Sequence, residues 1–366
     1  MTATGEFPAP GPQDREPAAS WAPVELPPPA PPPTGLPLQP PSYPRAAPMA
    51  QVPMLTAHKP GIVPLRPLQL ADILDGATKA IRFNPKSMVA LSAIVLALFL
   101  VPSAALGIGA TPLIETQLSK LGPGAQSFAG YPSALLESLS TTFATAILSG
   151  LLVYVVGQAV LGRKPGIGAT WAATRGRVLS LLTLMLLTGL FTLLAATLLI
   201  GPGVLVLTKN NVGAGLILTF LGLLLLIVVL VAVTTKIALA APAIVLEGHG
   251  VFTALRRSFT LTRGAFWRIL AITLLAGFLA YIASVLLGMP FSLTAMVIVF
   301  VSGQGSDSGQ MIATFVSHLS ALLTGAITTP FVAAVTGLLY IDRRMRLEAL
   351  DVVLLRESRS NPAPPL

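Results

Sequence analysis

The stretch that decides the fold is APAIVLEGHGVFTALRRSFTLTRGAFWRIL, residues 241–270. It leaves one long apolar segment, forms a short basic amphipathic segment, and enters the next apolar segment at Phe266 and Trp267. Weaker versions of this arrangement precede two other apolar segments. Alternation of long apolar segments with short basic ones is typical of a multi-pass membrane protein.

The composition supports a membrane protein. Of the 366 residues, 54% are hydrophobic and only 10% are charged, whereas soluble globular chains carry about 25% charged residues. The mean hydropathy is +0.80. The sequence contains no cysteine, which excludes disulfides, thiolate nucleophiles, cysteine-ligated zinc and iron–sulfur clusters.

Six segments are long enough to cross a bilayer, because about 20 helical residues span about 30 Å of hydrocarbon. Residues 291–302 are apolar but follow Gly288–Met289–Pro290 and are too few to span alone, so the sequence predicts a re-entrant or interfacial piece there. We therefore predict an all-α fold, a polytopic membrane helix bundle with six transmembrane helices. The expected spans are residues 88–109, 139–161, 178–200, 212–240, 266–287 and 312–340.

The orientation follows from lysine and arginine, which concentrate in cytoplasmic loops. Basic residues cluster before the first span, between spans 2 and 3, between spans 4 and 5, and after span 6. The opposite loops carry only Lys120 and Lys209. The pattern predicts a bacterial plasma-membrane protein with both termini in the cytoplasm.

An internal repeat accompanies this topology. The segments 74–82, 167–175 and 251–259 each precede an odd-numbered span. Each unit would be an interfacial helix followed by a helical hairpin, which makes three parallel repeats. Spans 3 and 4 are rich in leucine and are predicted to face lipid, whereas small residues recur every fourth position in spans 5 and 6 and favour close helix packing.

The ends of the chain are predicted to be disordered. Residues 1–64 hold 19 of the 33 prolines, a composition that cannot bury enough apolar surface to fold. We expect a disordered proline-rich cytoplasmic tail over residues 1–60, a membrane domain over 61–357 and a disordered C-terminal tail over 358–366. The proline-rich tail is either a solvated spacer or a docking site for a protein partner.

Charged residues at the cytoplasmic side form the candidate site. They are expected to bind the head groups of anionic lipids, or to form ion-pair latches between cytoplasmic segments, with Glu247 facing Arg256 and Arg257 and with Asp342, Glu348 and Asp351 among the arginines of the C-terminal segment. The candidate residues are Glu247, Arg256, Arg257, Arg263, Arg268, Asp342, Arg343, Arg344 and Arg346.

Catalytic and metal-binding motifs are missing from the sequence. It contains no H-E-x-x-H, G-x-S-x-G or Walker A motif. No predicted span carries Asp or Glu in its interior, and His318, in span 6, is expected to hydrogen-bond Ser317, Thr314 or a neighbouring helix. We expect no enzyme activity, no cofactor, no metal and no nucleic-acid partner.

Three stretches carry a family resemblance: PLRPLQLADILDGATKAIRFNP before span 1, PAIVLE with ALRRS and RGAFWR between spans 4 and 5, and YIDRRMRLEALD after span 6. Together they resemble the bacterial glycerophosphoryl diester phosphodiesterase membrane-domain family. The resemblance implies the fold and the membrane location. In full-length phosphodiesterases of that kind a catalytic barrel follows the membrane domain, and here only a short stretch follows span 6, so the resemblance implies a stand-alone membrane domain without that activity.

These observations predict a non-enzymatic integral membrane protein, a scaffold or accessory component that engages anionic lipid or a protein partner at the cytoplasmic face. The alternative is a transporter or channel for a small or lipid-like solute. The absence of acidic residues inside the predicted spans argues against ion-coupled transport.

Overall fold

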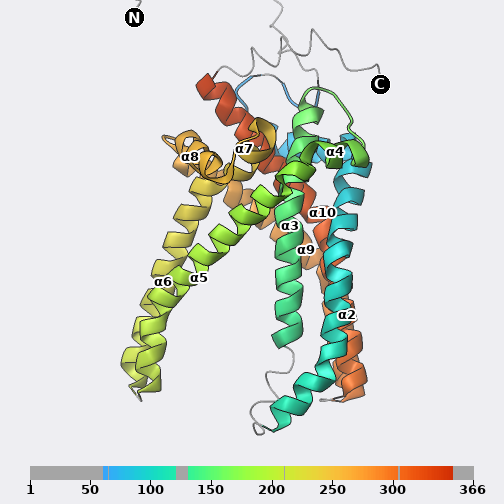
Figure 1. Cartoon of the computed structure of the whole chain (residues 1–366), viewed down its shortest axis with the longest axis vertical. Helices are drawn as coiled ribbons and strands as arrows, with labels where there is room; N and C mark the ends of the chain where they lie inside the picture. The colour runs from blue at the N-terminus through green and yellow to red at the C-terminus, as the bar shows by residue number, and fades with distance from the viewer. Residues whose placement is uncertain (1–60, 65, 121–130, 210, 304–305, 349–366) are drawn as a thin grey trace, which may run out of the picture. The chain divides into compact units, whose positions relative to one another are not determined.

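The computed structural model describes residues 61–64, 66–120, 131–209, 211–303 and 306–348. Both predicted disordered tails and Asp351 lie outside these residues. All the regular elements in the described ranges are helices (Figure 1). In chain order they are α1 (Leu70–Phe83), η1 (Lys86–Ala90), α2 (Leu91–Ser119), α3 (Tyr131–Val160), α4 (Ile167–Thr174), η3 (Arg175–Arg177), α5 (Val178–Thr208), α6 (Val212–Ile237), α7 (Ala240–Glu247), α8 (Val251–Thr262), α9 (Phe266–Ser302) and α10 (Asp307–Glu348).

Six helical segments in the described ranges are long and apolar enough to cross a membrane, which confirms the predicted six spans. The fold is therefore that of an all-α, multi-pass membrane protein. The candidate spans are Lys86–Ala110, Pro132–Val160, Ile167–Thr208, Val212–Glu247, Phe266–Ser302 and Ser308–Glu348.

The prediction of a separate re-entrant or interfacial piece at residues 291–302 is wrong. Helix α9 runs without interruption through Pro290 to Ser302. Helices α5 and α10 likewise continue through Pro202 and Pro330. Proline is a weaker stop signal in an apolar medium than in water, because ending a helix there would leave backbone groups without hydrogen-bond partners.

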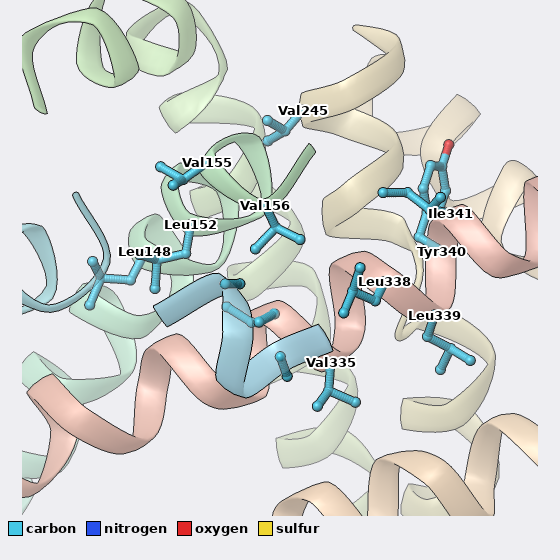
Figure 2. Close-up of a cluster of buried hydrophobic side chains, with 14 of the residues drawn as sticks. Leu148, Leu152, Val155, Val156, Val245, Val335, Leu338, Leu339, Tyr340 and Ile341 are labelled. Atoms are coloured by element: carbon cyan, nitrogen blue, oxygen red, sulfur yellow. The ribbon is translucent and has the colours of Figure 1, made fainter. Parts of the chain in front are cut away.

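Helices α3 and α10 form the centre of the core. Figure 2 shows Val156 of α3 near Leu338 of α10, with Leu152 and Leu148 following along α3, and these residues are buried. Small residues of α10 lie in this contact: a side chain at Gly337 would meet Val153 and Val156 of α3. The predicted small-residue packing therefore holds within this chain.

Helices α5 and α6 run side by side and pack mainly against each other, with fewer contacts to the rest of the bundle (Figure 1). Only 11% of the most apolar window of each is buried, compared with 61% for α3. The buried positions between them include Gly203, Gly215 and Gly222, where a side chain would collide with the partner helix. The prediction that spans 3 and 4 face lipid agrees with this exposure.

The chain before α2 is packed against the bundle. Ile62, Val63 and Leu68 are buried, and the backbone N–H of Ile62 donates to the carbonyl of Ala159 in α3. Helix α1 ends at Phe83, just before Pro85, as the proline predicts. Its buried residues, Ile73, Gly76, Ala77 and Ala80, pack in protein contacts, chiefly with α10.

Candidate functional site

The candidate residues gather where α7, α8, the start of α9 and the end of α10 meet. Two glycines shape this region: Gly248 and Gly264 both have φ +77°, a conformation that side-chain-bearing residues rarely adopt. Gly248 ends α7 and Gly264 makes the turn between α8 and α9. These turns place α8 between two membrane-crossing helices, with one face toward the bundle.

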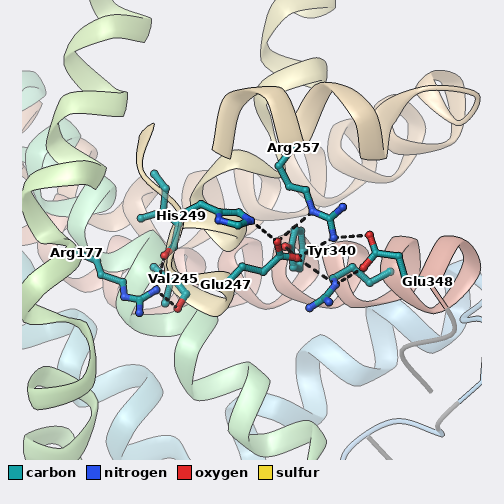
Figure 3. Close-up of polar contacts among 9 residues, drawn as sticks. Arg177, Val245, Glu247, His249, Arg257, Tyr340 and Glu348 are labelled. Carbon is teal, nitrogen blue, oxygen red and sulfur yellow. Dashed lines mark hydrogen bonds and ion pairs between the residues drawn. The ribbon is translucent and has the colours of Figure 1, made fainter. Parts of the chain in front are cut away.

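Glu247, the last residue of α7, is the acceptor of the first cluster (Figure 3). Arg257 of α8 binds it with two hydrogen bonds, from Nε to Oε2 and from Nη2 to Oε1, both at 3.1 Å. Arg344 of α10 adds an ion pair from Nε to Oε1 at 3.1 Å. The buried Tyr340 donates its hydroxyl to the same carboxylate. The Glu247 cluster therefore ties α7, α8 and α10 together.

Two more side chains complete the Glu247 cluster. His249 Nε2 lies 2.8 Å from Glu247 Oε2. Glu348 pairs with Arg257, and its Oε2 lies 2.9 Å from Arg344 Nε. Burial alone would lower the pKa of Arg257, but its hydrogen bonds to Glu247 and Glu348 outweigh that effect, so its pKa is raised above the ordinary value. Arg257 is thus held as a cation, and its guanidinium is paired with the carboxylates of Glu247 and Glu348.

Asp342 is the acceptor of the second cluster, and it is fully buried. Its Oδ1 accepts the backbone N–H of Leu68 at 2.8 Å and Nε of Arg346 at 2.9 Å. Its Oδ2 lies 3.1 Å from Arg268 Nη2. Both arginines also donate to the Leu68 carbonyl, Arg268 at 2.7 Å and Arg346 at 2.8 Å. The Asp342 cluster, Asp342 with Leu68, Arg268 and Arg346, therefore holds the segment before α1 against α9 and α10.

Two further arginines bind helix ends. Arg343 of α10 donates to the carbonyls of Leu261 at 2.8 Å and Arg263 at 3.4 Å, at the end of α8. Arg177 of η3 donates to the carbonyl of Ile244, near the end of α7, at 2.7 Å. The last carbonyls of a helix have no partners within it, so such cations satisfy them.

Arg256 and Arg263 differ from the other candidates. Both are exposed, and no carboxylate among the described residues pairs with either side chain. Phe252, Arg256 and Phe259 recur at helical spacing on the side of α8 opposite its buried residues, and Arg263 follows at its C-terminal end. Phe252 is 78% exposed, and Trp267 at the start of α9 is 77% exposed. We call Phe252, Arg256, Phe259, Arg263 and Trp267 the outer face of α8.

The structure corrects one prediction about the spans. Glu137, just outside the predicted span 139–161, lies on α3 near the start of the candidate span Pro132–Val160, which begins earlier than predicted. Its Oε2 accepts Ser317 Oγ at 3.0 Å and lies 3.6 Å from His318 Nδ1. The buried His318 contacts the Thr314 carbonyl at 2.9 Å, as predicted, and Ser103 Oγ of α2 at 3.1 Å.

The signal for the position of Glu137 was Tyr131–Pro132, because proline favours the first turn of a helix and here lies at the second residue of α3. The roles of Leu68 and Arg177 had no such signal, since both depend on backbone carbonyls brought together by the fold. Across the described residues, no group of three or more His, Asp or Glu side chains could hold a metal ion.

The helices and the charged clusters at one end define a multi-pass α-helical membrane protein. A family model described as a domain of unknown function, DUF7847, matches residues 68–340, which is more than half of the chain. The chain therefore belongs to the DUF7847 family. No curated protein and no solved structure matches it.

Proposed function

We propose that this chain is a non-enzymatic membrane scaffold or accessory protein that binds anionic lipid through the outer face of α8. The observation that carries the proposal is the contrast between neighbouring arginines. Arg257 is occupied by Glu247 and Glu348, whereas the exposed Arg256 and Arg263 have no acidic partner among the described residues.

The chemistry of the outer face suits a lipid surface. A basic residue next to an anionic membrane surface gains about 1 kcal/mol. Exposed aromatic residues beside it favour the interface, where an apolar ring meets polar head groups. Lys236 extends the basic character, since its Nζ lies 5.8 Å from the centre of the Phe259 ring. A free anion in water would not require the aromatic residues, so their presence favours lipid.

The rest of the proposal concerns the setting. We place the protein in a bacterial plasma membrane with both termini in the cytoplasm, on the strength of the lysine and arginine distribution. The short helices α1, α4 and α8, which precede α2, α5 and α9, support three parallel repeats. The residues resembling the glycerophosphoryl diester phosphodiesterase membrane domain favour the same setting, and the proline-rich segment is the proposed site for a protein partner.

Native mass spectrometry of the detergent-purified protein tests the lipid proposal. The variant Arg256→Gln/Arg263→Gln is compared with Lys120→Gln/Lys209→Gln, which loses the same charge outside the outer face. At about 1 kcal/mol per basic residue, affinity for phosphatidylglycerol should fall about thirtyfold in the first variant. In the second variant the affinity should stay within twofold of that of the unmodified protein, a difference in binding free energy on the order of 0.4 kcal/mol. The proposal would be refuted if the two variants lost phosphatidylglycerol affinity equally, or if neither variant lost it.

A second candidate function, transport of a small or lipid-like solute, is favoured by one observation. Hydroxyl-bearing side chains and a carboxylate line a groove along α3 and α10. Flux measurements in proteoliposomes distinguish the two functions: a scaffold leaves solute permeability at the level of protein-free vesicles.

A further inference from the structure

One face of α3 carries a row of hydroxyl groups. Ser138, Thr142, Thr145 and Ser149 follow one another at intervals of four, three and four residues, and Thr141 lies three residues after Ser138 and four before Thr145, so all five lie on one side of the helix. These side chains are exposed or half-buried, so they form a surface rather than part of the core.

Two cavities follow this row. The first, of about 420 Å³, is bounded by Glu137 and by Ala321 of α10. The second, of about 400 Å³, lies between α3, α7 and α10, and Thr145 lines both. From Glu137 to Val153 the lining residues of the two cavities cover about 24 Å of α3 at 1.5 Å per residue, most of the roughly 30 Å thickness of the hydrocarbon core. We call the two cavities together the hydroxyl groove.

The hydroxyl groups offer acceptors to the groove. Thr141, Thr142 and Thr145 each donate to a backbone carbonyl four residues earlier, at 2.7–2.8 Å. Thr328 and Thr336 of α10 do the same at 2.9 Å. A hydroxyl has one donor and two acceptor lone pairs, so once the donor is used the oxygen can only accept from a ligand.

Glu137 adds a charged acceptor at one end. Its side chain is 25% exposed, and it is the one carboxylate among the described residues that line the groove. The described lining contains no lysine or arginine. Ser317 holds one oxygen of Glu137 at 3.0 Å, which fixes the direction of the carboxylate. A groove that offers acceptors and one carboxylate favours a donor-bearing cation and disfavours an anion.

From this geometry we propose that the hydroxyl groove binds an amphiphile whose head group is a primary ammonium. The ammonium binds at Glu137, with its three N–H donors directed to the carboxylate and the neighbouring hydroxyl oxygens. The alkyl chain occupies the second cavity, whose wall includes Val153, Pro242, Val332 and Ala333. The Glu137 end of the groove lies at the opposite end of α3 from the part that contacts α7, and none of the residues of the outer face of α8 lines the groove, so the site does not depend on lipid binding by α8.

A photoreactive dodecylamine, with a diazirine in its alkyl chain, tests the proposal on the full chain in lipid nanodiscs. Two further probes share the chain: the trimethylammonium analogue keeps the charge without N–H donors, and the carboxylate analogue reverses the charge. Labelled residues are mapped by mass spectrometry. Labelling of α3 and α10 is normalised to that of the lipid-exposed α5, which corrects for partitioning into the bilayer.

The amine should label groove residues about tenfold more than either analogue, and Glu137→Gln should reduce that labelling about tenfold, as expected for loss of a hydrogen bond to a charged group. Thr142→Val should weaken labelling, since it removes a groove acceptor. Thr197→Val is the matched control, because Thr197 is also exposed and donates to its own helix, at Leu193, but lies on α5.

Equal groove labelling by the amine and the carboxylate probe would overturn the proposal. So would groove labelling that is the same in Glu137→Gln and Thr197→Val. Should Glu137→Gln fail to fold, the comparison of the three probes on the unmodified protein decides the question alone. Loss of phosphatidylglycerol binding in the α8 variant would leave these outcomes unchanged, so the two proposals fail separately.

Discussion

Replacing Asp342 by asparagine should release the segment before α1 from the bundle. The carboxylate is fully buried and accepts from the Leu68 N–H, Arg268 and Arg346. Asparagine keeps the shape but removes the charge, and its NH₂ group faces guanidinium donors. Removing one partner of a buried ion pair costs about 3–5 kcal/mol. Because the two arginine side chains are 31% and 34% exposed, water can solvate them, and we expect the lower end, about 3 kcal/mol.

Hydrogen exchange at the Leu68 amide measures this loss directly. A cost of about 3 kcal/mol corresponds to about 150-fold faster exchange when the amide exchanges through local opening. The matched control is Asp75→Asn, which removes an exposed pair with Lys79 on α1 and should cost less than about 0.5 kcal/mol. An unchanged Leu68 exchange rate in Asp342→Asn would refute the assignment of Asp342 as the residue that holds this segment.

Two further substitutions test the packing. The hydroxyl oxygen of the buried Ser258 accepts a hydrogen bond from the backbone N–H of Leu239 at 3.2 Å. In thermal unfolding in detergent, Ser258→Ala should therefore destabilise the protein by about 1–3 kcal/mol, whereas Thr260→Ala, at an exposed position, should change its stability by less than about 0.5 kcal/mol. Equal effects of the two substitutions would contradict the role of Ser258. A side chain at Gly222 would collide with a carbonyl of α5, whereas one at Gly213 would meet open space, so Gly222→Val should separate α5 from α6 in spin-label distance measurements and Gly213→Val should not.

The membrane spans could be predicted from the sequence because each depends mainly on local composition. Residues 266–287 can be recognised as a span from their own length and apolar composition, without knowledge of the helices that pack against them. The error at residues 291–302 arose from treating Pro290 as a stop signal. A lipid-facing helix gains nothing by ending there, since water is absent and a broken helix would expose its backbone.

The contacts of the candidate site could not be predicted in the same way. Leu68 and Asp342 are separated by 274 positions, and the donor in this hydrogen bond is the backbone N–H of Leu68, which carries no residue-specific signal. Glu137 was placed outside its span because the start of α3 was set by hydropathy alone. Its polar neighbours on α10, Ser317 and His318, lie close only after α3 and α10 have packed.

Helix geometry explains why adjacent arginines on α8 have different roles. Successive residues on a helix point about 100° apart, so a face that buries Ala254 and Leu261 turns Arg257 toward Glu247 and Arg256 away from it. The carboxylate of Glu247 lies on the side of α8 that carries Arg257, so it cannot also pair with Arg256. Loss of Arg257 should therefore weaken the join between α7, α8 and α10, whereas loss of Arg256 should change what binds the outer face and leave the fold intact. Measuring stability and lipid retention on the same two variants separates these effects, and a parallel loss of both properties in both variants would contradict the division.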